Sequence, residues 1–112
     1  MTALPLPGPL LRRLKPLAPH LDPVVRLGKA GLSDAFHAAL DRALLDHELV
    51  KLRFDHLKEQ KKPLALAIAA RAGAAIVQQV GNVLVLYRPQ PDPAKRRFEA
   101  PGASADSDSP TI

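Results

Sequence analysis

The sequence predicts a single compact α/β domain of the two-layer type, with a four-stranded mixed sheet and the element order α-β-α-β-α-β-β. Three observations carry this prediction: a length of 112 residues, alternating stretches of helical and strand periodicity, and no internal repeat of 20 residues or more. The chain has no cysteine. Its core must therefore hold the fold without disulfides or thiolate-bound metal.

The first half of the chain predicts helix, strand, helix and strand in turn. Leucines recur at helical spacing over residues 10–21, although Pro16 and Pro19 should end or kink that helix. Residues 23–27 are β-rich and bounded by Pro23 and Gly28, which is typical of a strand. Ser33 is a good N-cap for a helix from residue 34 onward, whose apolar face is Phe36, Ala39, Leu40, Ala43 and Leu44.

The second half of the chain predicts strand, helix and hairpin. Residues 48–55 alternate, with Val50, Leu52 and Phe54 facing the core. A helix should begin near Pro63 and end at Gly73. Residues 75–80 and 83–87 are apolar runs joined by Gly81-Asn82, a pair typical of a tight turn. Since these last strands are apolar at nearly every position, both faces of the sheet should be at least partly covered.

The domain itself is expected to span residues 10–88, between an N-terminal extension (1–9) and a disordered tail (89–112). The tail is rich in proline and small polar residues, so it cannot bury enough apolar surface to order itself. It carries a net charge of about −1, whereas the whole chain carries +5. The folded part therefore holds an excess of about +6, which favours a polyanionic partner.

The sequence does not favour an enzyme, a metal site, a cofactor or a small-molecule substrate. The four histidines lack metal-ligand spacing, and Lys51 stands where a zincin helix would need its second histidine after His47-Glu48. Ser33 is explained by capping. The longest apolar run, residues 64–70, is too short to span a bilayer, so we expect a cytoplasmic protein without membrane contact.

The loop Gly28-Lys29-Ala30-Gly31, between a predicted strand and a capped helix, is the most informative feature. Glycines let backbone approach a ligand closely, and the amide groups and dipole of the following helix attract phosphate oxygens. Lys29 adds a full charge. KH domains clamp a nucleic-acid backbone with such a loop, although two glycines around a lysine are also common in ordinary loops.

Other cations are also candidates for contact with a polyanion, although solvated faces carry charge too. Lys51 and Arg53 should lie on the non-core side of their strand. The remaining candidates are Arg12, Arg13 and Lys15 on the first helix and Arg88 after the last strand. Lys58, Lys61 and Lys62 fall in a connection where no contact can be localised. Tyr87 is the only tyrosine and is expected to pack in the core.

Three segments in this order resemble one known family. They are residues 14–33, with Pro23-Val24-Val25-Arg26-Leu27-Gly28-Lys29-Ala30-Gly31-Leu32-Ser33 at their centre, then residues 47–52 (His-Glu-Leu-Val-Lys-Leu), then residues 81–88 (Gly-Asn-Val-Leu-Val-Leu-Tyr-Arg). They resemble the YhbY/CRM (chloroplast RNA splicing and ribosome maturation) family over residues 10–88, in its bacterial stand-alone form.

The resemblance implies a fold similar to the C-terminal domain of bacterial initiation factor three. It also implies RNA binding during assembly of the large (50S) ribosomal subunit, with Gly28, Lys29, Ala30 and Gly31 contacting RNA. We expect a monomer that engages large-subunit rRNA. Two alternatives stay open: a general nucleic-acid module without preference for RNA, and a protein-interaction adaptor.

Overall fold

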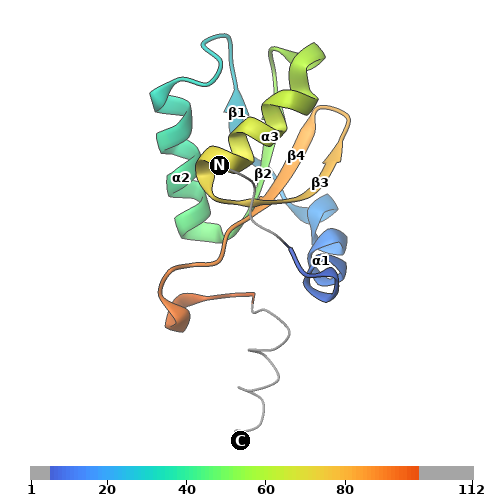
Figure 1. Cartoon of the computed structure of the whole chain (residues 1–112), viewed down its shortest axis with the longest axis vertical. Helices are drawn as coiled ribbons and strands as arrows, with labels where there is room; N and C mark the ends of the chain where they lie inside the picture. The colour runs from blue at the N-terminus through green and yellow to red at the C-terminus, as the bar shows by residue number, and fades with distance from the viewer. Residues whose placement is uncertain (1–5, 99–112) are drawn as a thin grey trace, which may run out of the picture.

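The computed structural model describes residues 6–98 and confirms the predicted α/β class and element order (Figure 1). Three short 3₁₀ turns join the regular elements: η1 (Lys15–His20), η2 (Lys58–Gln60) and η3 (Pro93–Lys95). The helices and strands are α1 (Gly8–Leu14), β1 (Pro23–Leu27), α2 (Asp34–His47), β2 (Leu49–Phe54), α3 (Lys61–Ala72), β3 (Ala75–Val80) and β4 (Val83–Tyr87).

The sheet is mixed, as predicted, with strand order β1-β2-β4-β3. β1 runs parallel to β2, and β4 is antiparallel to both of its neighbours. The carboxyl ends of β1, β2 and β3 therefore meet at one end of the sheet, which we call the loop end. Backbone hydrogen bonds join neighbouring segments at the loop end: Leu27 O accepts from Asp55 N at 3.1 Å, and Asn82 O accepts from Phe54 N at 2.8 Å.

One face of the sheet holds the main core, where α2 and α3 pack side by side (Figure 1). Leu40 and Leu44 of α2 and Ile68 of α3 are fully buried against Leu52 and Phe54 of β2. Alanines on the inner side of α3 allow its backbone to approach the strands closely. The helix ends at Gly73, which takes a left-handed conformation (φ +65°), as the sequence predicts.

The other face of the sheet is covered over one half only, by α1 and η1. Leu10 and Leu14 pack on Leu49 of β2 and Tyr87 of β4. These strand positions lie at the end opposite the loop end, as Figure 1 shows by the place of α1. Partial cover of both faces is therefore confirmed. Burial of Tyr87 is confirmed as well.

The first helix is shorter than its leucine spacing suggests. The α-helix ends at Leu14 and continues as the 3₁₀ turn η1 through His20. Pro16 and Pro19 cannot donate the backbone hydrogen bonds that a longer α-helix requires, which explains the change. The helix also begins at Gly8, and Leu6 packs on the cluster that contains Leu10, Leu14 and Tyr87, so the folded part starts before residue 10.

The tail does not begin at residue 89 as expected, because residues 89–98 pack on the domain. Among residues 6–98, Glu48 is the one buried polar or charged side chain, 2 % exposed. Its carboxylate accepts hydrogen bonds from the backbone N–H of Gln90, at 2.9 Å, and of Arg97. Phe98 then packs against the cluster under α1, with its ring edge-to-face to that of Tyr87. Nothing in the residue pattern indicates that a buried carboxylate holds this segment; residues 99–112 lie outside the described part.

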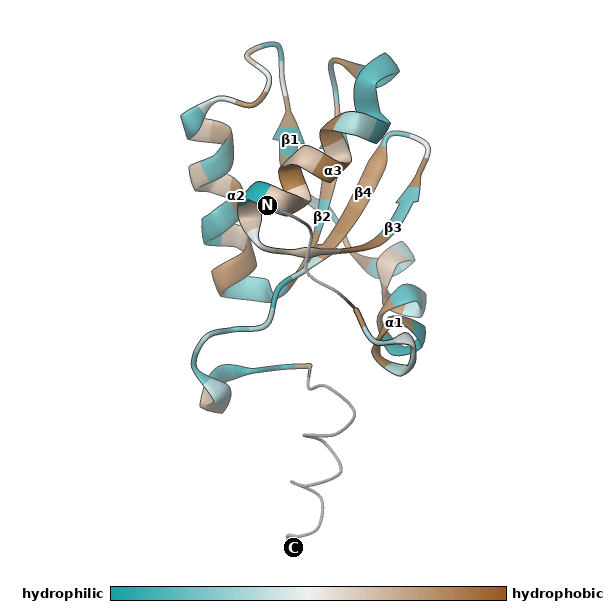
Figure 2. Cartoon of the chain, in the orientation of Figure 1, coloured by the Kyte–Doolittle hydropathy of each residue, from teal (hydrophilic) through white to brown (hydrophobic). Residues whose placement is uncertain are grey.

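Within the described part of the chain, no helix has the length and apolar character needed to cross a membrane. Figure 2 shows where polar residues gather instead. The turn that leads into α3 is strongly hydrophilic, while the strands are mostly hydrophobic.

Candidate nucleic-acid interface

The loop of residues 28–31 forms a closed turn at the loop end. Gly31 N donates to Gly28 O at 3.1 Å, and Ser33 N donates to Gly31 O at 2.8 Å. Lys29 and Ala30 lie at the exposed tip. Ser33 caps α2 as predicted, its hydroxyl accepting from Phe36 N at 3.1 Å. The turn thus presents Lys29 just before the positive end of the α2 dipole.

The two glycines of this loop have different reasons to be glycine. Gly31 has φ +68°, and a Cβ there would lie 3.3 Å from Cδ1 of Leu57, so the fold itself disfavours a side chain. At Gly28 the φ angle is ordinary, and among residues 6–98 no atom beyond its two chain neighbours lies within 4 Å of the place a Cβ would take. Packing therefore does not require glycine at position 28. The exposed backbone at Gly28 therefore has room for the close approach of a ligand.

The β2–α3 connection, which approaches this loop at Leu57, carries further lysines. The contact of Leu57 with Gly31 brings the β2–α3 connection against the loop. Lys58 and Lys62 are exposed there, and Lys61 is half-buried. Sequence reasoning could not localise these three lysines, because nothing in their spacing shows which loop they approach.

The uncovered half of the second sheet face carries the predicted strand cations and one that was missed. Arg53 of β2 lies opposite Arg26 of β1 in the register. Asp55 pairs with both, at 3.3 Å from Arg53 and 3.5 Å from Arg26. The alternation of side chains along β1 was the signal for Arg26: because Val25 and Leu27 are buried on one side, Arg26 must lie on this face. We call Arg26, Lys51 and Arg53 the cationic sheet face.

Lys51 has a structural bond as well as a place on this face. Its ammonium donates to Leu21 O at 3.1 Å, which ties β2 to the segment before β1. The side chain is half-buried, whereas Arg53 is exposed. Of the two predicted contacts on β2, Arg53 is the more accessible.

The remaining candidates lie away from the loop. Arg12, Arg13 and Lys15 are exposed on α1 and η1, which cover the opposite end of the sheet. Arg88 lies at that end too, since its N–H donates to Glu48 O just before β2. Its guanidinium bonds to the Asp41 carboxylate at 2.8 Å and to Ala72 O at 2.9 Å. Arg88 therefore joins β4 to α2 and α3.

Two side chains have displaced pKa values. Partial burial lowers the pKa of His37 below 6.5; the nearby Arg71 guanidinium lowers it further, and Asp34 opposes this. Burial raises the pKa of the Tyr87 hydroxyl above 10.0, and the Glu48 carboxylate adds to the rise. Neither group lies in the loop or on the cationic sheet face. Within residues 6–98 no cluster of three or more ligating side chains could hold a metal ion.

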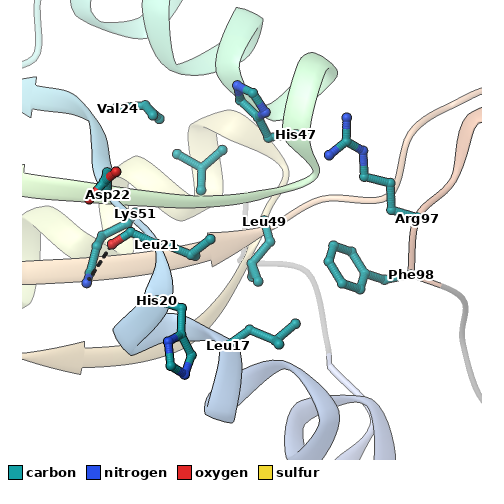
Figure 3. A pocket seen from close by; sticks show the side chains of 11 residues that line it. Leu17, His20, Leu21, Asp22, Val24, His47, Leu49, Lys51, Arg97 and Phe98 are labelled. Carbon is teal, nitrogen blue, oxygen red and sulfur yellow. Dashed lines mark hydrogen bonds between the residues drawn. The ribbon is translucent and has the colours of Figure 1, made fainter.

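A cavity of about 390 Å³ opens at the edge of the sheet (Figure 3). β1 pairs with β2 only from Lys51 onward, so Leu49 and Val50 extend past β1 and form part of the floor. η1, the end of α2 and residues 97–98 surround it. Sequence reasoning missed this cavity, because one of its walls belongs to the segment expected to be disordered.

The arrangement defines a class of protein: a small α/β domain with a cationic loop and a cationic sheet face. Comparison with known proteins then identifies the family, since the family model described as the CRS1 / YhbY (CRM) domain matches residues 6–88. The chain belongs to this family.

Individual relatives agree with that assignment. A Haemophilus influenzae protein named as an RNA-binding protein is 46 % identical over 77 residues, which cover 68 % of this chain and 78 % of the relative. The probable RNA-binding protein YqeI of Bacillus subtilis is 33 % identical over 84 residues, 74 % of this chain and 88 % of the relative.

A solved structure is similar as well. The solution structure of the hypothetical protein SAV1595 from Staphylococcus aureus, which is proposed to bind RNA, superimposes with a TM-score of 0.69 at 27 % identity. The match covers 85 % of this chain and all of that one. It bears out the predicted fold.

Proposed function

We propose that the chain binds RNA through the loop of residues 28–31 and acts as a monomeric, non-catalytic assembly factor for the large ribosomal subunit in the cytoplasm. The observation that carries the proposal is Gly28, an exposed loop position where a Cβ would meet no packed neighbour, so packing within residues 6–98 does not account for the glycine. A phosphate oxygen seated there would meet Lys29 and the positive end of α2. The names of the relatives support RNA as the polyanion.

The cationic residues around the loop extend this contact. Lys58 and Lys62 are exposed on the β2–α3 connection at the same end of the sheet, and the cationic sheet face adjoins the loop end through Asp55, whose N–H bonds to Leu27 O. With few exposed aromatic side chains, affinity should come mainly from phosphate contacts and fall steeply with salt.

The salt dependence of binding tests the loop directly. We expect Lys29→Ala to weaken binding to a large-subunit rRNA fragment and to flatten the slope of log affinity against log salt by about one. Arg42→Ala is the matched control, because Arg42 is an exposed cation on α2 that pairs with Asp46 at 3.2 Å. Equal affinity and slope for Lys29→Ala and wild type would refute the loop assignment.

Competition between nucleic acids separates RNA binding from general nucleic-acid binding. A domain that recognises A-form shape or the 2′-hydroxyl should prefer a structured RNA over a DNA duplex of equal length. Equal competition by the DNA would favour a general module instead.

Sedimentation of cell extract tests the ribosomal role. The protein should travel with immature large-subunit particles and leave that position after nuclease treatment. A small complex that resists nuclease would indicate a protein adaptor.

A further inference from the structure

The cavity beside β2 has the size and lining of a small-molecule site. Its volume of about 390 Å³ falls within the range of about 300–1,000 Å³ that such sites occupy. Two apolar side chains in its lining stay exposed, Val24 at 54 % and Leu17 at 38 %. The fold therefore leaves apolar surface uncovered at this place.

The walls suit a flat ring. Figure 3 shows Phe98 pointing from the C-terminal segment toward Leu49, with His20 and His47 on two other sides of the opening. Aromatic rings and imidazoles are the side chains on which proteins stack unpaired RNA bases. The aliphatic floor of Leu21, Leu49 and Val50 adds no competing polar group from its side chains.

The charges around the cavity suit a phosphate. Lys51 and Arg97 line it, against a single carboxylate, Asp22. Lys51 also belongs to the cationic sheet face, and Val24 lies on the same side of β1 as Arg26. The cavity is thus continuous with the face along which a bound RNA strand would run.

We propose that this cavity binds one unstacked nucleotide of RNA, with the base against Phe98 and the aliphatic floor and the phosphate toward Arg97. This rests on the proposed function, yet it places a contact at a site distinct from the loop. Glu48 then has a part in binding, because it holds the backbone of Arg97 and so positions that wall. Glu48 is a positioning residue here.

Titration of the ¹⁵N-labelled full chain with nucleoside 5′-monophosphates tests the site without any larger RNA. We expect saturable NMR shifts of the backbone amides of Leu49, Val50, Lys51 and Phe98 at millimolar ligand. Inorganic phosphate at equal concentration should shift these amides much less, because it has no ring to fill the cavity. No saturable shift, equal shifts with phosphate, or shifts confined to residues 28–31 would overturn the proposal.

Two substitutions with a matched control sharpen the result. Phe98→Leu keeps an apolar side chain but removes the aromatic face, and we expect it to weaken nucleotide binding at least fivefold. Arg97→Ala keeps the backbone N–H that Glu48 holds and should weaken binding severalfold, whereas Lys95→Ala removes a charge from the same segment outside the cavity and should change nothing. Equal effects of Arg97→Ala and Lys95→Ala would refute a specific phosphate contact.

The outcome is separable from that of the loop. If the cavity proposal fails, Lys29→Ala still alters RNA binding and its salt slope. If the loop proposal fails, nucleotide shifts at Lys51 and Phe98 persist.

Discussion

At the residue scale, Gly28 and Gly31 separate what the fold requires from what binding requires. Both come from one short motif in the sequence, which shows no difference between them. The structure distinguishes the two glycines, because only Gly31 combines a left-handed φ with a close neighbour, Cδ1 of Leu57. Sequence could therefore predict the loop but not which of its glycines is free of a packing role.

Alanine substitution of each glycine should have opposite consequences. Gly28→Ala should leave the free energy of unfolding unchanged or raise it by up to about 1 kcal/mol, because alanine restricts the unfolded chain. The same substitution should weaken RNA binding. Gly31→Ala should cost about 1–2 kcal/mol through its positive φ. Urea denaturation and RNA titration measure both quantities; a Gly28→Ala protein that is destabilised like Gly31→Ala would show that Gly28 also serves the fold.

Glu48 is the second residue whose role sequence could not reveal. We expect Glu48→Ala to lower the free energy of unfolding by about 2–3 kcal/mol, because two backbone N–H groups lose a charged acceptor. Hydrogen exchange at the amides of Gln90 and Arg97 should accelerate as residues 89–98 separate from the domain. Asp46→Ala, an exposed carboxylate on α2, is the control; unchanged protection in Glu48→Ala would contradict this account.

At the element scale, periodicity predicts every strand and helix but not their partners. The alternation of Val50, Leu52 and Phe54 identified β2 and its core side, and Gly73 identified the end of α3. It could not show that β4 would lie between β2 and β3, because strand order depends on contacts far apart in sequence. For the same reason Arg88 was a candidate contact in the sequence, whereas the structure shows that it anchors β4 to α2 and α3.

The position of Arg88 gives a prediction about that choice. Arg88→Ala should cost about 2 kcal/mol of unfolding free energy, since it removes a side chain that is only 18 % exposed together with its bonds to Asp41 and Ala72. The affinity of Arg88→Ala for RNA should stay within about twofold of wild type, because Arg88 lies far from the loop and distant sites affect each other little. A large loss of affinity in a protein of native stability would make Arg88 a contact instead.

The packing of α2 beside α3 can be followed through His37. Its folded pKa lies below 6.5, so the folded state binds the proton less readily than the unfolded chain does. The stability that neutral His37 contributes is thus full above pH 6.5 and falls as pH drops through the folded pKa. NMR titration should show a rise in this pKa in Arg71→Ala and a further fall in Asp34→Asn; a wild-type pKa above 6.5 would contradict the assignment.

At the scale of the whole molecule, charge is distributed unevenly over the fold. The net charge of +5 suggests a polyanion only in general terms. The fold brings Lys29, Lys58 and Lys62 to the loop end and sets Arg26 and Arg53 on the adjoining open half of the sheet. α1 covers the other half and carries its own cations away from the loop. Cations from segments that are separate in sequence thus gather at and beside the loop end.

The most direct measurement of the central claim is ultraviolet crosslinking in cells, with the linked peptide and the linked RNA both mapped. We predict crosslinks to large-subunit rRNA from residues 28–31 and from the exposed lysines of the β2–α3 connection. These crosslinks should be fewer in a Gly28→Ala strain that expresses the protein at normal level. Crosslinks that avoid this loop, or that spread over unrelated RNAs without enrichment in rRNA, would contradict the account.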